Sequence, residues 1–211
     1  MDAAEPHLDL EALPFFAGLP KSARDRLLGV SGILRAGAGT VVFEQGETPR
    51  FQYLVVDGTA QLFGRTAEGR EVLIDVVEPP ELLLPAALAS GGPYLMEART
   101  PEPSRLVLIP AAAFREAMAQ EQALSQAVVA SLARQFRRMA RQIKNLKLRS
   151  ASERVGCYIL AQARRQGSPS RVVLPLEKKL IASELGLTRE SFSRALSGLR
   201  RHGIAVRGDT I

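Results

Sequence analysis

Cysteine and histidine are scarce in this chain, whose 211 residues include one cysteine, Cys157, and two histidines, His7 and His202. One thiol cannot form a disulfide within the chain, and it cannot supply the four thiolates that hold an iron–sulfur cluster. Both kinds of site are therefore excluded for a single copy. The scarcity of cysteine also favours a reducing, cytoplasmic location.

Long apolar runs are absent as well, since no stretch approaches the ~20 consecutive apolar residues that span a bilayer. The N-terminal sequence MDAAEPHLDLE is acidic and lacks the basic start and apolar core of a secretory signal. We therefore expect no membrane partner and no export.

The chain also lacks the residue sets that common enzymes use. It has no serine, histidine and aspartate set, no metal-binding cluster and no phosphate-binding loop at a usable spacing. The sequence therefore predicts a protein that is not an enzyme.

Positive charge is concentrated near the C-terminus. The net charge is +6, but residues 1–148 hold 16 Lys/Arg against 17 Asp/Glu, whereas residues 149–211 hold 12 against 5. Nucleic-acid phosphates or an anionic membrane surface would attract such charge, and the attraction should weaken steeply with salt. Arg200 and Arg201 flank the helical segment considered next, which favours nucleic acid.

Residues 180–203, with the sequence LIASELGLTRESFSRALSGLRRHG, predict two short amphipathic helices joined at Gly186. Apolar residues repeat at helical spacing in both halves. Thr188 stands where the second helix would be capped, and Gly203 stands where it would end. This is the pattern of a helix-turn-helix.

The second helix carries a polar face made of Arg189, Glu190, Ser193 and Arg194. When the N-terminus of such a helix enters the major groove, arginine can bind guanine and glutamate can accept from cytosine, while serine is less selective. A solvated face with an Arg–Glu pair is the alternative. The preceding helix, the glycine corner and the basic segment that follows favour DNA reading.

The segment LGLTRESFSRALSGLRRHGI resembles the recognition segment of the Crp/Fnr family of transcription regulators. The resemblance implies a homodimer that binds double-stranded DNA and acts with RNA polymerase. It also implies that Arg189, Glu190, Ser193 and Arg194 read bases, with Thr188 near a phosphate. Arg189 is similar to the cyclic AMP receptor branch and Ser193 to the Fnr branch, so the half-site sequence stays open.

Short β-type runs punctuated by glycine follow a helical cap expected over residues 8–30. The runs cover residues 38–43, 51–56, 60–64, 71–77 and 105–109. Their length and their turn signals, such as Asp57-Gly58, predict a compact barrel or sandwich. Ahead of a helix-turn-helix, this pattern resembles the double-stranded β-roll of cyclic-nucleotide-binding domains. The predicted fold class is therefore α+β.

The β-roll resemblance implies an effector pocket, and there the sequence departs from the family. In the family, a Gly-Glu turn and a downstream Arg-Ser or Arg-Thr pair hold the nucleotide, whereas this chain has Pro80-Glu81 and Tyr94-Leu95. A buried phosphate without a cationic partner would carry a large desolvation cost. Cyclic AMP is therefore not expected as the effector.

The residues expected to line this pocket are mostly apolar: Glu81, Leu82, Leu83, Leu84, Tyr94, Leu95 and Met96. Two interpretations stay open, a filled apolar core without a ligand and a site for a large apolar ligand such as haem. The second draws on a resemblance to the nitric-oxide-sensing regulators of denitrification, which also lack the arginine pair. Haem iron needs an axial donor, for which His7 and Met96 are weak candidates.

Residues 111–148 predict a long helix with a heptad seam. The apolar positions of the seam alternate three and four residues apart: Val129, Leu132, Phe136, Met139, Ile143 and Leu146. A helix packed on its own β-roll is the alternative, but the strict seam favours pairing with a second copy. Pairing would place two recognition helices one DNA turn apart, as palindromic half-sites require.

These patterns divide the chain into a β-roll sensor domain over residues 1–110, a dimerisation helix over residues 111–148 and a winged helix-turn-helix domain over residues 149–211. We expect wing strands at residues 171–174 and 204–211. The predicted function is a homodimeric, sequence-specific transcription regulator controlled by a signal other than cyclic AMP. The alternatives are a ligand-binding or interaction protein with a non-selective helix-turn-helix, and a ligand-independent regulator.

Overall fold

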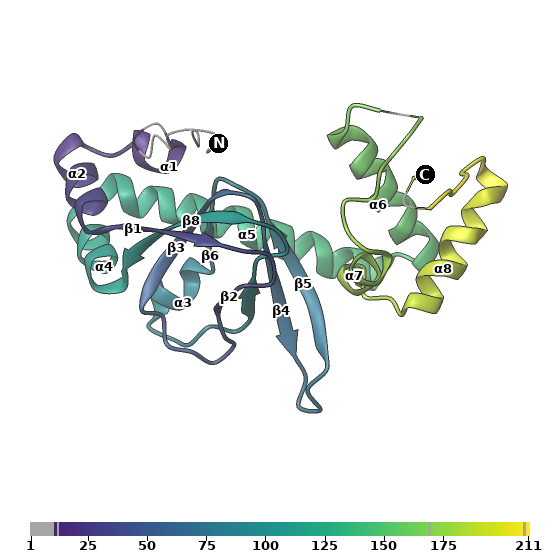
Figure 1. Cartoon of the computed structure of the whole chain (residues 1–211), viewed down its shortest axis with the longest axis horizontal. Helices are drawn as coiled ribbons and strands as arrows, with labels where there is room; N and C mark the ends of the chain where they lie inside the picture. The colour runs from purple at the N-terminus through teal and green to yellow at the C-terminus, as the bar shows by residue number, and fades with distance from the viewer. Residues whose placement is uncertain (1–10, 12, 169, 209) are drawn as a thin grey trace, which may run out of the picture. The chain divides into compact units, whose positions relative to one another are not determined.

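The computed structural model describes residues 11, 13–168, 170–208 and 210–211. The chain forms two compact units, one of residues 1–71 and 75–135 and the other of residues 72–74 and 136–211. Strands dominate the first unit, and short helices dominate the second (Figure 1). The predicted combination of a β-roll, a long helix and a helix-turn-helix is confirmed.

The β-roll consists of two four-stranded sheets, with strand orders β1-β8-β3-β6 and β2-β7-β4-β5. The strands are β1 Gly32–Ala36, β2 Val41–Phe43, β3 Phe51–Asp57, β4 Ala60–Arg65, β5 Glu71–Val77, β6 Glu81–Leu83, β7 Glu97–Arg99 and β8 Ser104–Pro110. Strand β6 pairs on one side only, with β3, and is therefore an edge strand of the first sheet.

Alternation along the strands divides the apolar side chains between two cores. Tyr53, Leu83 and Leu106 belong to the inner core, which contains residues of both sheets. Their chain neighbours Leu54 and Leu82 belong to the outer core, where they pack with residues of the flanking helices. The first sheet is therefore covered on both faces, by the second sheet and by helices.

The helices that contribute most residues to the outer core of the first sheet are α1 Pro14–Ala17, α2 Lys21–Val30, α4 Ala111–Gln120 and α5 Gln122–Leu148, and Leu88 of the short helix after β6 also belongs to it. The expected helical cap is confirmed from Pro14 onward, and residues 8–10 and 12 of that prediction lie outside the described residues. A further helix, α3 Pro85–Ser90, follows β6.

The single helix predicted over residues 111–148 is in fact two helices. Glu121 interrupts it with extended backbone angles, φ −116° and ψ 103°. The Ser125 hydroxyl donates to the Met118 carbonyl oxygen at 2.6 Å, which satisfies a group that the end of α4 leaves without a helical partner. Arg26 holds Glu121 by an ion pair of 3.1 Å. Neither contact is visible from periodicity.

The second unit contains α6 Ala151–Arg165, α7 Lys178–Glu184, α8 Arg189–Gly198 and the 3-10 helix η1 Leu199–His202. Its core includes Val155, Ile181 and Phe192, one from each α-helix. The predicted wing strands are reduced to isolated bridges, such as Val173 with Thr210. Residues 204–206, expected as a strand, are irregular.

A capping box begins α6. The Ser150 hydroxyl accepts from the Glu153 backbone N–H at 3.3 Å, and the Glu153 carboxylate accepts from the Ser150 backbone N–H at 2.8 Å. Hydrogen bonds from Ser150 hold the pKa of Glu153 below its usual value. Without these two side chains, the backbone N–H groups of Ser150 and Glu153 would have no partner at the start of the helix.

We predict that Ser150→Ala lowers the free energy of unfolding by about 0.5–2 kcal/mol, the usual effect of losing such a cap. Urea unfolding followed by circular dichroism measures it. Ser170→Ala, at an exposed position outside the helices, is the control and should change nothing. Equal stability of both variants would show that the box does not stabilise α6.

Candidate nucleic-acid interface and effector region

The corner between α7 and α8 requires glycine. Gly186 has a φ of +62°, which L-residues rarely adopt. A Cβ atom built there would lie 2.5 Å from Cδ2 of Leu146, so a side chain would also clash. The predicted glycine corner is confirmed, and it packs against the end of α5.

Thr188 caps α8 as predicted, because its hydroxyl accepts from the Ser191 backbone N–H at 3.1 Å. Arg194 donates to the Ser191 hydroxyl at 3.3 Å, so Ser191 links the cap to the second turn. Sequence reasoning did not single out Ser191. Its position three residues after a threonine cap was the available signal.

The structure brings the residues predicted to read bases together. Arg189, Glu190, Ser193 and Arg194 are all exposed on the first two turns of α8, whereas Phe192 is buried in the core of the second unit. This arrangement exposes guanidinium, carboxylate and hydroxyl groups that can form further hydrogen bonds outside the chain.

Glu190 is held as a carboxylate. A hydrogen bond from its own backbone N–H, a second from the Thr188 hydroxyl and the charges of Arg189 and Arg194 lower its pKa. An ionised carboxylate only accepts hydrogen bonds, so Glu190 suits a donor such as the cytosine amino group.

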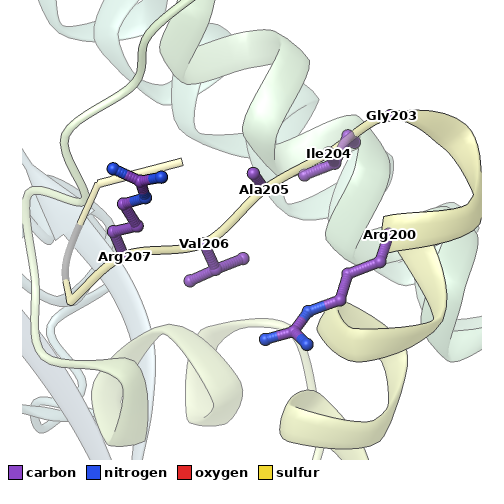
Figure 2. Close-up of a pocket in the computed structure, with 6 residues that line it drawn as sticks. All are labelled: Arg200, Gly203, Ile204, Ala205, Val206 and Arg207. Atoms are coloured by element: carbon purple, nitrogen blue, oxygen red, sulfur yellow. The ribbon is translucent and has the colours of Figure 1, made fainter.

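Positive charge surrounds this helix. Residues 136–211, which form nearly all of the second unit, hold 17 Lys/Arg against 5 Asp/Glu. A shallow groove at the end of η1 is lined by two cations and a mostly apolar floor: Arg200, Gly203, Ile204, Ala205, Val206 and Arg207 (Figure 2). Arg200 extends from η1 and Arg207 from the segment after it, so both can contact phosphate groups.

The structure brings together part of the set predicted to line an effector pocket, since Leu83, Leu84, Tyr94 and Met96 gather at the inner core. Leu82 belongs to the outer core and Leu83 to the inner core, because they alternate along β6. Met96 packs against the inner core and Leu84 is partly buried beside it. Leu95, with 78% of its surface exposed, does not line a buried pocket.

Glu81 is also not the glutamate of a Gly-Glu turn. It lies within β6, and its buried carboxylate accepts hydrogen bonds from Ser131 and Arg134 of α5. The turn into α3 is made by Leu84, whose φ of +41° is of the kind that favours glycine, followed by Pro85. At this turn the chain therefore has neither the glycine nor the glutamate that the resemblance to the family implies.

Tyr94 fills the position where the family has arginine. Its ring stacks on Phe43 with centroids 3.7 Å apart, and its hydroxyl donates to the Phe51 carbonyl oxygen at 2.9 Å. Burial raises the pKa of Tyr94, so the side chain is neutral. A neutral, hydrogen-bonded ring offers no charge to a phosphate.

Arg99, the nearest arginine in sequence, is already engaged. It donates to Glu71 at 3.1 Å and to Glu97, and its guanidinium carbon lies 5.0 Å from the centre of the Phe63 ring. Two carboxylates and an aromatic face hold this cation at the second sheet. The guanidinium of Arg99 cannot bind a phosphate without breaking these contacts.

Of the two axial donors considered for haem, Met96 packs against the inner core, and His7 lies outside the described residues. Cys157 and His202 belong to the second unit. Over the described part of the chain, no three histidine, cysteine or acidic side chains cluster as metal ligands would.

The heptad seam of α5 is largely exposed. Phe136 is 72% exposed and Ile143 is 54% exposed. Three further seam residues are also exposed: Val129, Met139 and Leu146. Leu132 differs, because it packs partly against the outer core of the β-roll. Five of the six predicted seam residues therefore expose apolar surface, although Leu146 also lies against Gly186.

Among the helices that the structure describes, none combines the length and the apolar character that crossing a bilayer requires.

Comparison with known proteins matches both parts of the chain. The cyclic nucleotide-binding domain family matches residues 33–121, and the Crp-like helix-turn-helix domain family matches residues 153–211. The CRP-like cAMP-activated global transcriptional regulator of Mycobacterium tuberculosis is 27% identical over 178 residues, covering 82% of this chain and 80% of that protein.

Two further relatives come from Bradyrhizobium. The nitrogen fixation regulation protein FixK of Bradyrhizobium diazoefficiens is 25% identical over 79% of this chain and 70% of its own length. The structure of FixK2 from Bradyrhizobium japonicum superposes with a TM-score of 0.72 at 23% identity, covering 86% of this chain and 91% of that one, which supports the fold.

We predict that cyclic AMP gives no saturable heat when titrated into the full chain. The reason is that Tyr94 and Leu95 replace the residues that would hold its phosphate, and a buried unpaired phosphate is costly. Isothermal titration calorimetry measures this directly. One-to-one binding with micromolar affinity would contradict the assignment of Tyr94.

Proposed function

Because the chain belongs to the Crp/Fnr family of DNA-binding transcription regulators, with a cyclic-nucleotide-binding-type domain and a Crp-like helix-turn-helix, we propose that it acts as a homodimer on a palindromic DNA site. Regulators of this family are not enzymes, in agreement with the absence of a catalytic set in the sequence. The proposal includes contact with RNA polymerase, as the family resemblance implies.

One observation carries the proposal: the exposed polar face at the start of α8. A helix that enters the major groove by its N-terminal end presents residues of its first two turns to base edges. Arg189, Glu190, Ser193 and Arg194 occupy these turns, and their apolar neighbours are buried. We assign base reading to these four residues and a phosphate contact to Thr188.

Dimerisation is proposed from the apolar seam of α5. Phe136, Met139, Ile143 and Leu146 follow the alternating three and four spacing of a two-stranded coiled coil. Their exposure in a single chain is unfavourable, since apolar surface gains about 25 cal/mol per Å² when it is buried. A second copy of the same helix offers the same seam, and a two-fold dimer matches a palindromic site.

The regulatory signal is proposed to be something other than a cyclic nucleotide. The relative from Mycobacterium tuberculosis is described as cAMP-activated. This chain differs at the residues that matter, because Leu84-Pro85 stand at the turn and Tyr94-Leu95 stand at the Arg-Ser position. The observations favour a regulator whose β-roll is filled by its own side chains.

We predict that Arg189→Ala weakens binding to a site selected from random DNA by about 1–3 kcal/mol and relaxes the preference for one guanine. A bidentate contact from arginine to guanine is lost, while the exposed position spares the fold. Fluorescence anisotropy with the selected site and single-base variants measures both effects.

Arg200→Ala is the control for Arg189→Ala, because Arg200 lies in the basic groove rather than on the polar face. It should weaken binding to all sequences alike and reduce the salt slope by about 1. If Arg189→Ala also weakened all sequences alike, its assigned role in base reading would be wrong.

We predict that Phe136→Glu raises the dimer dissociation constant on the order of a hundredfold. Each copy of the dimer would then place one carboxylate in the apolar seam. Phe136 is exposed in the single chain, so the variant should fold. Sedimentation equilibrium measures the constant, with Arg137→Glu, outside the seam, as the control. Unchanged dimerisation of Phe136→Glu would place the interface elsewhere.

A further inference from the structure

An ion pair between the buried carboxylate of Glu81 and the half-exposed Arg134 fastens α5 to the edge strand β6. The Glu81 carboxylate accepts from the Ser131 hydroxyl at 2.6 Å and from two nitrogens of Arg134, Nε and Nη2, each at 3.1 Å. The Gln135 side chain donates to the Leu82 carbonyl oxygen at 2.9 Å. We call these five residues the Glu81 clamp.

The clamp closes the contact between α5 and the β-roll. Leu124, Val128 and Ser131 are the buried residues of α5, and they repeat at helical spacing on one face. Arg134 and Gln135 continue that face by one turn. The first compact unit ends at Gln135, so the clamp is the last anchor of α5 before its second half.

The position of the clamp determines which side of α5 faces away from the β-roll. At 3.6 residues per turn, the apolar seam is rotated by roughly a quarter of a turn from the face that carries Ser131 and Gln135. Phe136, an exposed seam residue, follows directly after Gln135. Along the helix held by the clamp, the seam therefore keeps this fixed angle about the helix axis from the clamped face.

Burial of the carboxylate makes this arrangement hard to alter. Glu81 is 6% exposed. Burial raises its pKa, but hydrogen bonds from Arg134 and Ser131 and the Arg134 charge outweigh that effect and lower it. Rotating or sliding α5 would separate the buried carboxylate from Ser131 and Arg134, which is unfavourable.

We propose that the Glu81 clamp is a built-in positioning device that presents the dimer seam of α5 without a bound small molecule. The inference rests on the proposed function, and it deepens it by naming how the regulator reaches its DNA-binding form. Contacts between β6 and α5 come from the chain itself, so dimerisation and DNA binding proceed without an effector.

The test uses Glu81→Gln and Arg134→Met in the full chain, with no small molecule added. Each variant removes one charge of the clamp and keeps the size of the side chain. Both should raise the dimer dissociation constant and the DNA dissociation constant in parallel, by about tenfold each. Arg141→Met, exposed on the same face two turns later, is the control and should change the dimer constant less than twofold.

A double variant, Glu81→Leu with Arg134→Met, separates positioning from stability. Replacing both charges leaves no unpaired buried charge, so the unfolding midpoint should return toward that of the unmodified chain. Dimer and DNA affinity should stay reduced. Recovery of both affinities along with the unfolding midpoint would overturn the positioning role.

Two further outcomes are decisive. If Glu81→Gln does not fold, Ser131→Ala removes one hydrogen bond and no charge, and should weaken both affinities about threefold; no change would overturn the proposal. If the unmodified chain bound its selected DNA only after a cyclic nucleotide was added, ligand independence would be wrong. Failure of the unmodified chain to select any DNA would instead refute the proposed function.

Discussion

The structure depends on the way α5 divides its surface between two kinds of contact. Leu124 and Val128 pack in the outer core of the β-roll, whereas Phe136, Met139 and Ile143 leave apolar side chains exposed. The buried side anchors the helix, and the exposed side requires a partner. In the proposed homodimer a second copy of the chain provides that partner, and its two-fold symmetry matches the proposed palindromic target.

The β-roll and the helix-turn-helix show opposite relations to their family. The second unit keeps the features that DNA reading needs: the glycine corner, the threonine cap and the polar face of α8. The β-roll keeps the architecture, but Tyr94 is hydrogen-bonded in the core and Arg99 is held by Glu71 and Glu97, so neither side chain is placed to hold a phosphate.

Periodicity and turn residues predict the helix-turn-helix, five strands and most of α5, because their patterns are local. The failures have non-local causes. Strands β6 and β7 are three residues long, too short for an alternating pattern, and their pairing with β3 and β4 forms them. The break at Glu121 and the role of Glu81 depend on contacts with distant residues, Arg26 and Arg134. Leu132 follows the heptad but packs partly on the β-roll. The prediction missed this because a sequence does not show which side of a helix its own domain covers.

Selection of binding sites from random double-stranded DNA by the purified full chain, with no small molecule added, tests the account most directly. The account predicts enrichment of an inverted repeat whose half-site centres lie about one helical turn, or 10–10.5 base pairs, apart. It also predicts a protein-to-DNA ratio of two chains per site. Enrichment of a single asymmetric half-site, or no enrichment until an effector is supplied, would contradict it.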